Sequence, residues 1–332
     1  ARRDWVILFE SGANRDPLLA RTQIEVLRHL LDNAEHDDTF TLATANTRVH
    51  FFDKAPRPAT KKNVDEAIAW LETAHLIGAL DLNQALEAVT PVCKTARNAY
   101  LVHVGAGVPA LGERRDDVLA KRIPAGARYV GIGVGKKWNR AFMKQAADRS
   151  NGYFTQINPD EPIRWKAFDL LATLNTPRLM DVKVSDRFGK RAFLTEALTL
   201  AEGEELCAIT RADAKLGEKL PPSVLITGVL DGKPFREELK IKDAKPGADY
   251  LPRTWAKLEI DRLLAEGSEK NQEAITKLSM AMYVMSPFTS LLVLETEEDY
   301  KKFNVDRGRK DHWAMYDCPP RMPTVYEPDP LR

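Results

Sequence analysis

The sequence predicts an α/β fold: a doubly wound, mostly parallel sheet, followed by an antiparallel β region and a helical segment. Three observations predict it. Between residues 5 and 175, short apolar runs alternate with segments of helical period, which is typical of a parallel sheet covered by helices on both faces. Beyond Pro177 the apolar period becomes two, as in antiparallel strands, and from Pro252 it becomes helical again.

The first predicted strand is the apolar run at residues 5–9, which a small and polar loop at 10–16 follows. A helix with one apolar face then begins near Leu18. In open α/β sheets, ligands bind beyond the carboxyl ends of the strands. We therefore expect the loop at 10–16 to contribute to any functional site.

Further strands of this sheet are predicted where apolar runs recur. They lie at 39–43, 47–52, 100–104, 129–132 and 153–157, with helical stripes between them at 64–71, 82–89, 138–146 and 163–174. The strand at 100–104 runs into a second glycine-rich loop at 105–109. We expect this loop to lie at the same edge of the sheet as the first one.

The second half of the chain is predicted to contain strands at 179–185, 206–210, 224–230 and 235–241. Asp231-Gly232 separates the last two and is a strong hairpin signal. Helical stripes at 255–262 and 275–285 and a return strand at 290–294 follow, before a proline-rich tail. The predicted divisions are a first domain at 1–176, an antiparallel β domain at 177–248, a helical segment with its return strand at 249–305, and the tail at 306–332.

Composition argues against several classes of protein. Lys and Arg total 49 against 48 Asp and Glu, so a net charge of +1 gives no reason to expect a nucleic-acid partner or an anionic membrane surface. No apolar run approaches the ~20 residues of a transmembrane helix, and no signal peptide is visible. Cys93, Cys207 and Cys318 lie far apart without a Cys-x-x-Cys pair, which predicts neither a disulfide framework nor a zinc site.

Several segments resemble a von Willebrand factor type A domain. Residues 128–133, with the polar helix and the Ser150-Asn151-Gly152-Tyr153-Phe154 segment after them, are similar to the fifth strand, helix and return strand of that family. Residues 77–87 are similar to the threonine loop of its metal site and the helix after it. The resemblance implies a fold used for protein binding and adhesion.

Two later segments narrow the resemblance to the inter-alpha-trypsin inhibitor heavy chains and their bacterial relatives. These segments are 250–256 (YLPRTWA) and 286–293 (SPFTSLLV). In that family a small VIT domain precedes the A domain, and no such domain is visible here. The resemblance therefore implies a fragment, a processed subunit or a divergent member, with an exported or cell-envelope location and a protein partner in a larger assembly or in an upstream VIT-like domain.

Type A domains of this family hold a divalent ion at the strand ends through an Asp-x-Ser-x-Ser loop, a Thr and a second Asp. Placed residue by residue, these positions fall on Phe9, Ser11, Ala13 and Leu80, with the last near Gly105 or Ala106. Ser11 alone keeps an oxygen. Sliding the first loop by one residue places Glu10, Gly12 and Asn14 instead, but it would break the alignment of the strand. Since Mg²⁺ requires several hard oxygen ligands, the resemblance implies a degenerate site with no metal and no cofactor.

We therefore predict a non-enzymatic protein-interaction or structural assembly module without catalytic residues. Its expected ligand-binding rim consists of Glu10, Ser11, Asn14, Asp81 and His103. One alternative is a cation-dependent adhesion domain that uses Glu10, Asn14 and Asp81 in an atypical geometry. Another is a hydrolase with Glu10, Ser11 and His103 grouped at the strand ends. A histidine such as His103 within a buried strand is, however, more typical of a hydrogen-bonded core residue.

Overall fold

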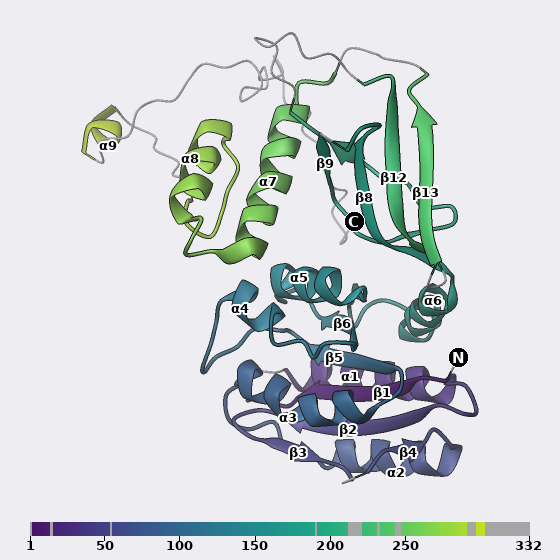
Figure 1. Cartoon of the computed structure of the whole chain (residues 1–332). Helices are drawn as coiled ribbons and strands as arrows, with labels where there is room; N and C mark the ends of the chain where they lie inside the picture. The colour runs from purple at the N-terminus through teal and green to yellow at the C-terminus, as the bar shows by residue number, and fades with distance from the viewer. Residues whose placement is uncertain are drawn as a thin grey trace, which may run out of the picture.

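A computed structural model describes residues 2–13, 16–53, 55–189, 191–211, 221–230, 233–242, 247–290 and 297–302. Figure 1 shows a first β-sheet flanked by helices, a second β-sheet, and a pair of helices beside the second sheet. The first sheet belongs to residues 4–157 and the second to residues 178–240. This arrangement confirms the predicted fold class, with a mostly parallel sheet followed by an antiparallel one.

The first sheet has the strand order β3-β2-β1-β5-β6-β7, and β4 pairs with β2. Its strands are β1 (Asp4–Glu10), β2 (Thr39–Ala45), β3 (Val49–Phe51), β4 (Arg57–Pro58), β5 (Ala99–Gly105), β6 (Arg128–Val134) and β7 (Tyr153–Ile157). The strands β2, β1, β5, β6 and β7 run parallel, whereas β3 and β4 are antiparallel to β2. We call the edge where the parallel strands end the carboxyl edge, and the edge where they begin the amino edge.

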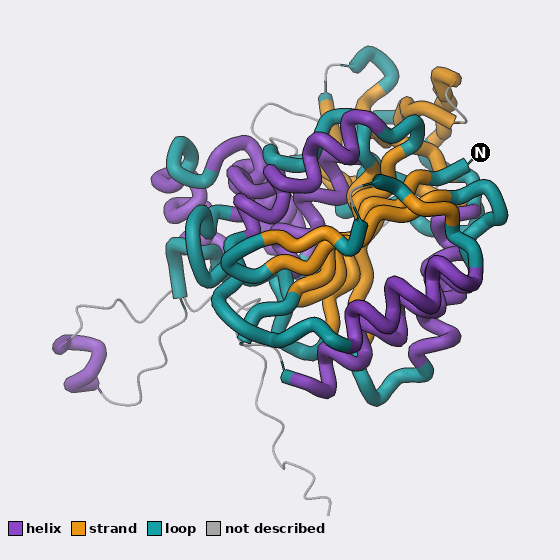
Figure 2. The backbone as a smooth tube through the Cα atoms, turned by 90° about the horizontal axis from the view of Figure 1, so that it is seen from below, coloured by secondary structure: helices purple, strands orange, loops and turns teal. Residues whose placement is uncertain are grey.

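Helices cover both faces of this sheet, as the view in Figure 2 shows. One face packs against α1 (Pro17–Asp32), α2 (Lys61–Glu72) and α6 (Ile163–Asn175). The other packs against α3 (Leu82–Thr95), α4 (Asp116–Ala120) and α5 (Arg140–Ser150). Each face therefore has its own hydrophobic core, as a doubly wound sheet requires.

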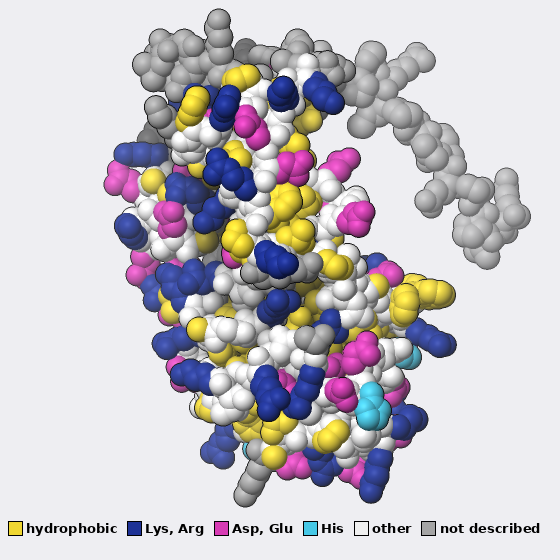
Figure 3. Space-filling model, turned by 45° about the vertical axis from the view of Figure 1, so that its right-hand side comes forward, with side chains coloured by type: hydrophobic (Ala, Val, Ile, Leu, Met, Phe, Trp, Pro, Cys, Tyr) yellow, Lys and Arg dark blue, Asp and Glu magenta, His cyan; other side chains and the backbone are white. Residues whose placement is uncertain are grey.

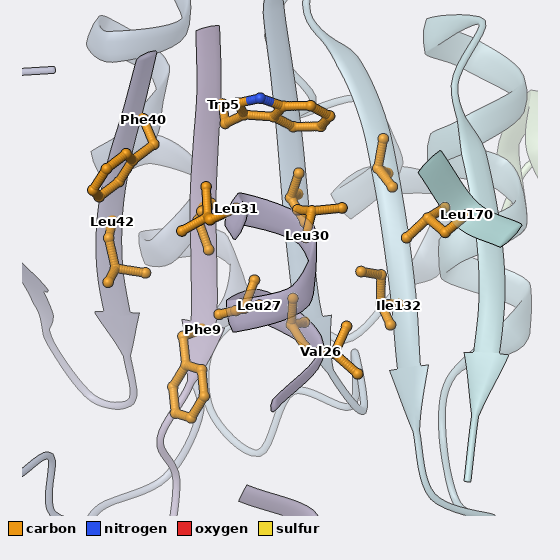
Figure 4. Close-up of a cluster of buried hydrophobic side chains, with 14 of the residues drawn as sticks. Trp5, Phe9, Val26, Leu27, Leu30, Leu31, Phe40, Leu42, Ile132 and Leu170 are labelled. Carbon is orange, nitrogen blue, oxygen red and sulfur yellow. The ribbon is translucent and has the colours of Figure 1, made fainter. Parts of the chain in front are cut away.

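The sequence of β1 shows how both cores are filled from one strand. Trp5, Ile7 and Phe9 point to one face and join Leu27 and Leu30 of α1, among others, in the core shown in Figure 4. The intervening residues Val6 and Leu8 belong to the opposite core. Every residue of β1 is buried, which explains the continuous apolar run in the sequence.

The strand also contains Glu10, which was expected to begin the loop. The parallel register of β1 with β2 continues to Glu10 opposite Ala45. Because side chains alternate along a strand, Glu10 lies on the same face as Leu8, opposite to Phe9. The predicted boundary at residue 9 is one residue short.

The second sheet is antiparallel, with the order β11-β9-β8-β12-β13 and β10 paired with β8. Its strands are β8 (Arg178–Asp186), β9 (Ala192–Thr195), β10 (Leu200–Ala201), β11 (Ala208–Ile209), β12 (Ser223–Leu230) and β13 (Lys233–Lys240). The pairing of Leu230 with Lys233 confirms the hairpin predicted at residues 231 and 232, which themselves lie outside the described residues.

The helical segment consists of α7 (Leu251–Gly267), α8 (Gln272–Met282) and the short α9 (Glu297–Lys302). Residues just after α7 contact α4 of the first sheet: the Ser268 hydroxyl donates to Asp117 Oδ1 (2.9 Å), and Arg115 pairs with Glu269 (2.5 Å). Apart from Ser290, the predicted return strand at 290–294 lies outside the described residues, as does the tail. Among the described helices, none has both the length and the apolar composition that crossing a bilayer requires.

Candidate functional site

Three loops meet at the carboxyl edge of the first sheet. The segment after β1, the segment before α3 and the loop after β5 are joined by backbone hydrogen bonds. These run from Ala13 N to Gly78 O (2.8 Å), from Ile77 N to Ser11 O (3.1 Å) and from Leu111 N to Leu80 O (3.0 Å). The edge is therefore a connected surface built from segments that lie up to 100 residues apart in sequence.

Beneath these loops, the Glu10 carboxylate is almost fully buried, and three hydrogen-bonding neighbours surround it among the described residues. Its Oε1 lies 2.8 Å from His103 Nε2 and accepts from the amide of Gly107 (2.6 Å). Its Oε2 accepts from the amide of Ala106 (2.8 Å). A buried carboxylate costs free energy unless donors surround it, and here the histidine ring and two backbone amides supply them.

His103 connects Glu10 to Tyr129 on the neighbouring strand β6. Its ring is fully buried, and its Nδ1 lies 2.8 Å from the Tyr129 hydroxyl. Burial and the negative charge of Glu10 raise the pKa of Tyr129 well above its ordinary value, so the phenol keeps its proton. The phenol then donates to Nδ1, and a proton on Nε2 faces Glu10. With this tautomer, the two ring nitrogens, the phenol and the carboxylate all have hydrogen-bond partners.

Gly105 makes room for this arrangement at the end of β5. A Cβ atom at this position would lie 2.2 Å from Glu10 Cδ, a distance that no side chain tolerates. Gly107 has a positive φ of 67°, which favours glycine and turns its amide toward Glu10. The glycine-rich loop predicted at 105–109 is thus shaped around a carboxylate of the protein itself.

Ser11 does not join His103 and Glu10. Its hydroxyl donates to Ala45 O (3.3 Å) and accepts from Asn46 Nδ2 (3.3 Å), both at the end of β2. Both ring nitrogens of His103 already have other partners. The hydrolase hypothesis grouped these three residues, but the structure brings together only Glu10 and His103.

Asp81 has a structural role at the start of α3. Its side chain caps the helix by accepting from the amide of Gln84 (3.0 Å). Its own amide donates to Asn46 O (3.0 Å), which ties α3 to the turn after β2. Asn14, the remaining residue of the expected rim, lies outside the described residues.

The positions that would hold a divalent ion carry other chemistry. Phe9 and Leu80 are buried in the two hydrophobic cores, and the Glu10 carboxylate is bound by His103 and the loop after β5. Within the part of the chain that the structure describes, no three acidic, histidine or cysteine side chains form a group able to hold a metal. The residues present therefore do not fit the Mg²⁺ site that the fold family implies.

Apolar side chains project into solvent from the same loops. Ile77 is 60% exposed, and Val108 and Leu111 are each 44% exposed. Leu18, in the first turn of α1, is 58% exposed. We call these four residues the apolar rim. Sequence analysis missed the rim, since Ile77, Val108 and Leu111 occur in loops without any periodic pattern and Leu18 lies at the very start of a helix.

Sequence analysis also missed the role of Tyr129 and the pairing of Glu10 with His103. The signal lies in the register of β1 and β5, where Leu8 is opposite His103. Side chains two residues apart share a face, so Glu10 and His103 come to the same face at the end of neighbouring strands. This register becomes known only once the strands are paired.

The sequence is similar to that of several known proteins, although no family model matches it. The chain is 22% identical to inter-alpha-trypsin inhibitor heavy chain H2 of Mus musculus, over 87% of this chain and 34% of that protein. It is also 22% identical to heavy chain H3 of Bos taurus, over 87% of this chain and 36% of that protein. The chain thus spans about a third of the length of these relatives.

Among solved structures, the fold is similar to a von Willebrand factor type A protein from Catenulispora acidiphila. The TM-score is 0.52 at 14% identity, and the match covers 85% of this chain and 80% of that one. Together these matches confirm the resemblance inferred from the sequence. The chain is thus similar in sequence to the inter-alpha-trypsin inhibitor heavy chains and has a von Willebrand factor type A-like fold.

Proposed function

We propose that this chain is a non-enzymatic protein-interaction module whose binding loops are held in place without a metal ion. One observation carries the proposal: the Glu10 carboxylate binds His103 and the amides of Ala106 and Gly107. Through these contacts, Glu10 fastens the loop after β5 to the end of β1. In this proposal Glu10 has the positional role that a shared metal ion would have in joining loops.

The apolar rim is the proposed contact surface for the partner. Loops whose backbones are already joined by hydrogen bonds lose little backbone freedom on binding. Apolar side chains that become buried at an interface supply much of its affinity. Ile77, Val108 and Leu111 have this character. In this proposal the rim belongs to a domain at residues 1–176. A β domain at 177–248 and a helical segment at 249–305 follow it in sequence. The partner would be another protein of a larger assembly or an upstream VIT-like domain.

The cation-dependent alternative requires the Glu10 carboxylate to exchange three internal donors for an ion. A buried carboxylate that gives up such donors leaves the histidine ring and two amides unsatisfied, at a cost of about 1–3 kcal/mol for each group. The observed geometry favours the metal-independent proposal.

Thermal unfolding with and without divalent ions tests metal independence. A ligand at 100 times its Kd stabilises the folded state by about 2.7 kcal/mol. We expect the same Tm in Mg²⁺, in Mn²⁺ and in EDTA. A rise of Tm with Mg²⁺ in the wild type that Glu10→Gln abolishes would show that the site binds an ion after all.

Capture experiments on immobilised chain test the rim. Val108→Asp and Ile77→Asp should abolish binding of any partner that the wild type retains in EDTA. Phe188→Asp is the matched control, because Phe188 is a 78% exposed apolar residue in the turn between β8 and β9 of the second sheet. A partner that binds all three variants equally would place the interaction surface elsewhere.

A further inference from the structure

A cavity of about 870 Å³ lies at the amino edge of the first sheet, where it meets the second sheet. The walls come from the segment between α4 and β6, the end of α5, the connection from α6 to β8, and Val229 of β12. Its volume is within the range of small-molecule sites. It is distinct from the rim, which lies at the opposite edge.

Two arginines of the wall have no acidic partner among the described residues. Arg128 donates to the Tyr100 hydroxyl (3.0 Å) and stacks over that ring, and Arg149 has no polar partner within the described part of the chain. A hydrogen bond from the Tyr129 amide to the Ser150 hydroxyl (2.9 Å) places these two arginines on adjacent segments. Figure 3 shows Lys and Arg side chains around the waist between the two parts of the molecule.

Other cations of the wall are already neutralised. Arg178 forms hydrogen bonds to both carboxylate oxygens of Glu204 (3.1 and 2.7 Å), and Lys121 lies 3.6 Å from Asp117. Arg128 and Arg149 therefore provide the positive charge that faces the cavity. Paired guanidinium groups match the geometry of phosphate oxygens.

Asn151 and Asp181 lie on the same cavity wall as the two arginines. Asn151 Nδ2 donates to Asp181 Oδ2 (3.4 Å), which directs Asn151 Oδ1 away from the carboxylate. That Oδ1 atom is buried, and no donor reaches it among the described residues. With almost no accessible surface, this atom is out of reach of a ligand. The accessible acceptor on this part of the wall is the Asp181 carboxylate, which is exposed.

We propose that this cavity binds a small hydroxylated anion of the sugar-phosphate class. Arg128 and Arg149 bind its phosphate group, and the Asp181 carboxylate accepts hydrogen bonds from its hydroxyl groups. The proposal is independent of the rim and of the protein partner. It accounts for the chemistry of the wall, where two arginines without an acidic partner among the described residues and one exposed carboxylate line the same cavity.

Calorimetric titration of the full chain with glucose 6-phosphate, inorganic phosphate and glucose tests the proposal. We expect glucose 6-phosphate to bind more tightly than phosphate, and glucose to bind weakest. Arg149→Ala should weaken both phosphate probes about tenfold or more, because a charge-assisted hydrogen bond is lost. Asp181→Asn should weaken glucose 6-phosphate and leave inorganic phosphate unchanged.

Arg164→Ala is the matched control, because Arg164 is an exposed arginine near the start of α6, at the far end of a helix whose last residues line the cavity. Thermal unfolding of each variant verifies that the fold persists. The proposal is overturned if the wild type binds neither phosphate probe, or if Arg149→Ala binds them as Arg164→Ala does. Equal affinity for both phosphate probes, unaffected by Asp181→Asn, would overturn the hydroxylated ligand and leave free phosphate as the bound species.

Discussion

The two edges of the first sheet handle charge in opposite ways. At the carboxyl edge, the carboxylate of Glu10 is enclosed by donors from the protein itself. At the amino edge, Arg128 and Arg149 face a cavity without an acidic partner among the described residues. Removing one member of a buried charged network is costly, whereas a charge that faces a cavity is available to a ligand. The carboxyl edge therefore uses its buried charge within the fold, and the amino edge presents charge to a cavity.

The largest expected effect breaks the enclosed carboxylate. Glu10→Ala removes the partner of His103 Nε2 and of two buried amides, and we expect a loss of about 3–5 kcal/mol in the free energy of unfolding. Urea denaturation measures it. Glu10→Gln keeps an acceptor for the amides and should cost clearly less. A loss below about 1 kcal/mol for Glu10→Ala would contradict the structural role of Glu10.

A second prediction tests the space around the same group. Gly105→Ala would place a Cβ atom 2.2 Å from Glu10 Cδ, so the pinned side chain must move. Such overpacking costs about 1–3 kcal/mol. Gly247→Ala is the control, because φ is not positive there and a Cβ would meet only the end of the Leu251 side chain, which is 36% exposed. If Gly105→Ala unfolds at the same urea concentration as the wild type, the carboxylate is not fixed as described.

A third prediction tests the contribution of Tyr129 to stability separately from that of Glu10. Tyr129→Phe leaves His103 Nδ1 without its partner in a fully buried position. The expected loss is about 1–2 kcal/mol in the free energy of unfolding. Tyr153→Phe is matched, since no hydrogen bond to its hydroxyl exists among the described residues and the aromatic ring is kept. Equal stability of the two variants would show that the histidine gains nothing from the phenol.

The smallest expected effect belongs to Asp4, at the beginning of β1, and depends on pH. Although burial opposes ionisation of Asp4, hydrogen bonds from Thr39, Arg2 and the amides of Asn98 and Arg97 hold its pKa below the ordinary value. Because the folded-state pKa is the lower one, the stabilisation is present above the unfolded-state pKa of about 3.9 and is lost as pH falls through the folded-state value.

Asp4→Asn therefore tests this carboxylate at the amino edge. We expect it to cost about 1 kcal/mol at pH 7 and less at pH 3, which is below the unfolded-state pKa of about 3.9. The measurement is the difference in unfolding free energy between wild type and variant across that range. A difference that is the same at both pH values would mean that ionisation of Asp4 does not stabilise the fold.

Periodicity predicted most of the fold because it reports burial directly. The continuous apolar run of β1 reflects a strand that is buried on both faces. The alternation of apolar and polar residues around 224–241 reflects the hairpin of β12 and β13. The end of β1 was misplaced because Glu10 is charged, and such a residue is buried here because His103 of β5 and the amides of the loop after β5 bind it. The two-residue strand β4 is too short to show a period.

The candidate site was less predictable than the fold. Glu10, Ser11, Asp81 and His103 were all expected at the carboxyl edge, yet their roles differ: two form a buried pair, one supports the turn after β2 and one caps a helix. Roles depend on which atoms meet, and this follows from pairing between strands about 90 residues apart. Tyr129 enters the network for the same reason, from a strand that reads in sequence as ordinary core.

The contact between α4 and the residues after α7 has a mechanical consequence. Arg115 and Asp117 adjoin the loop that contains Val108 and Leu111, and they bind Glu269 and Ser268, which follow α7. If a bound partner displaced that loop, these two contacts would have to stretch or to move α7 with it. The helices α7 and α8 would then resist displacement of the apolar rim.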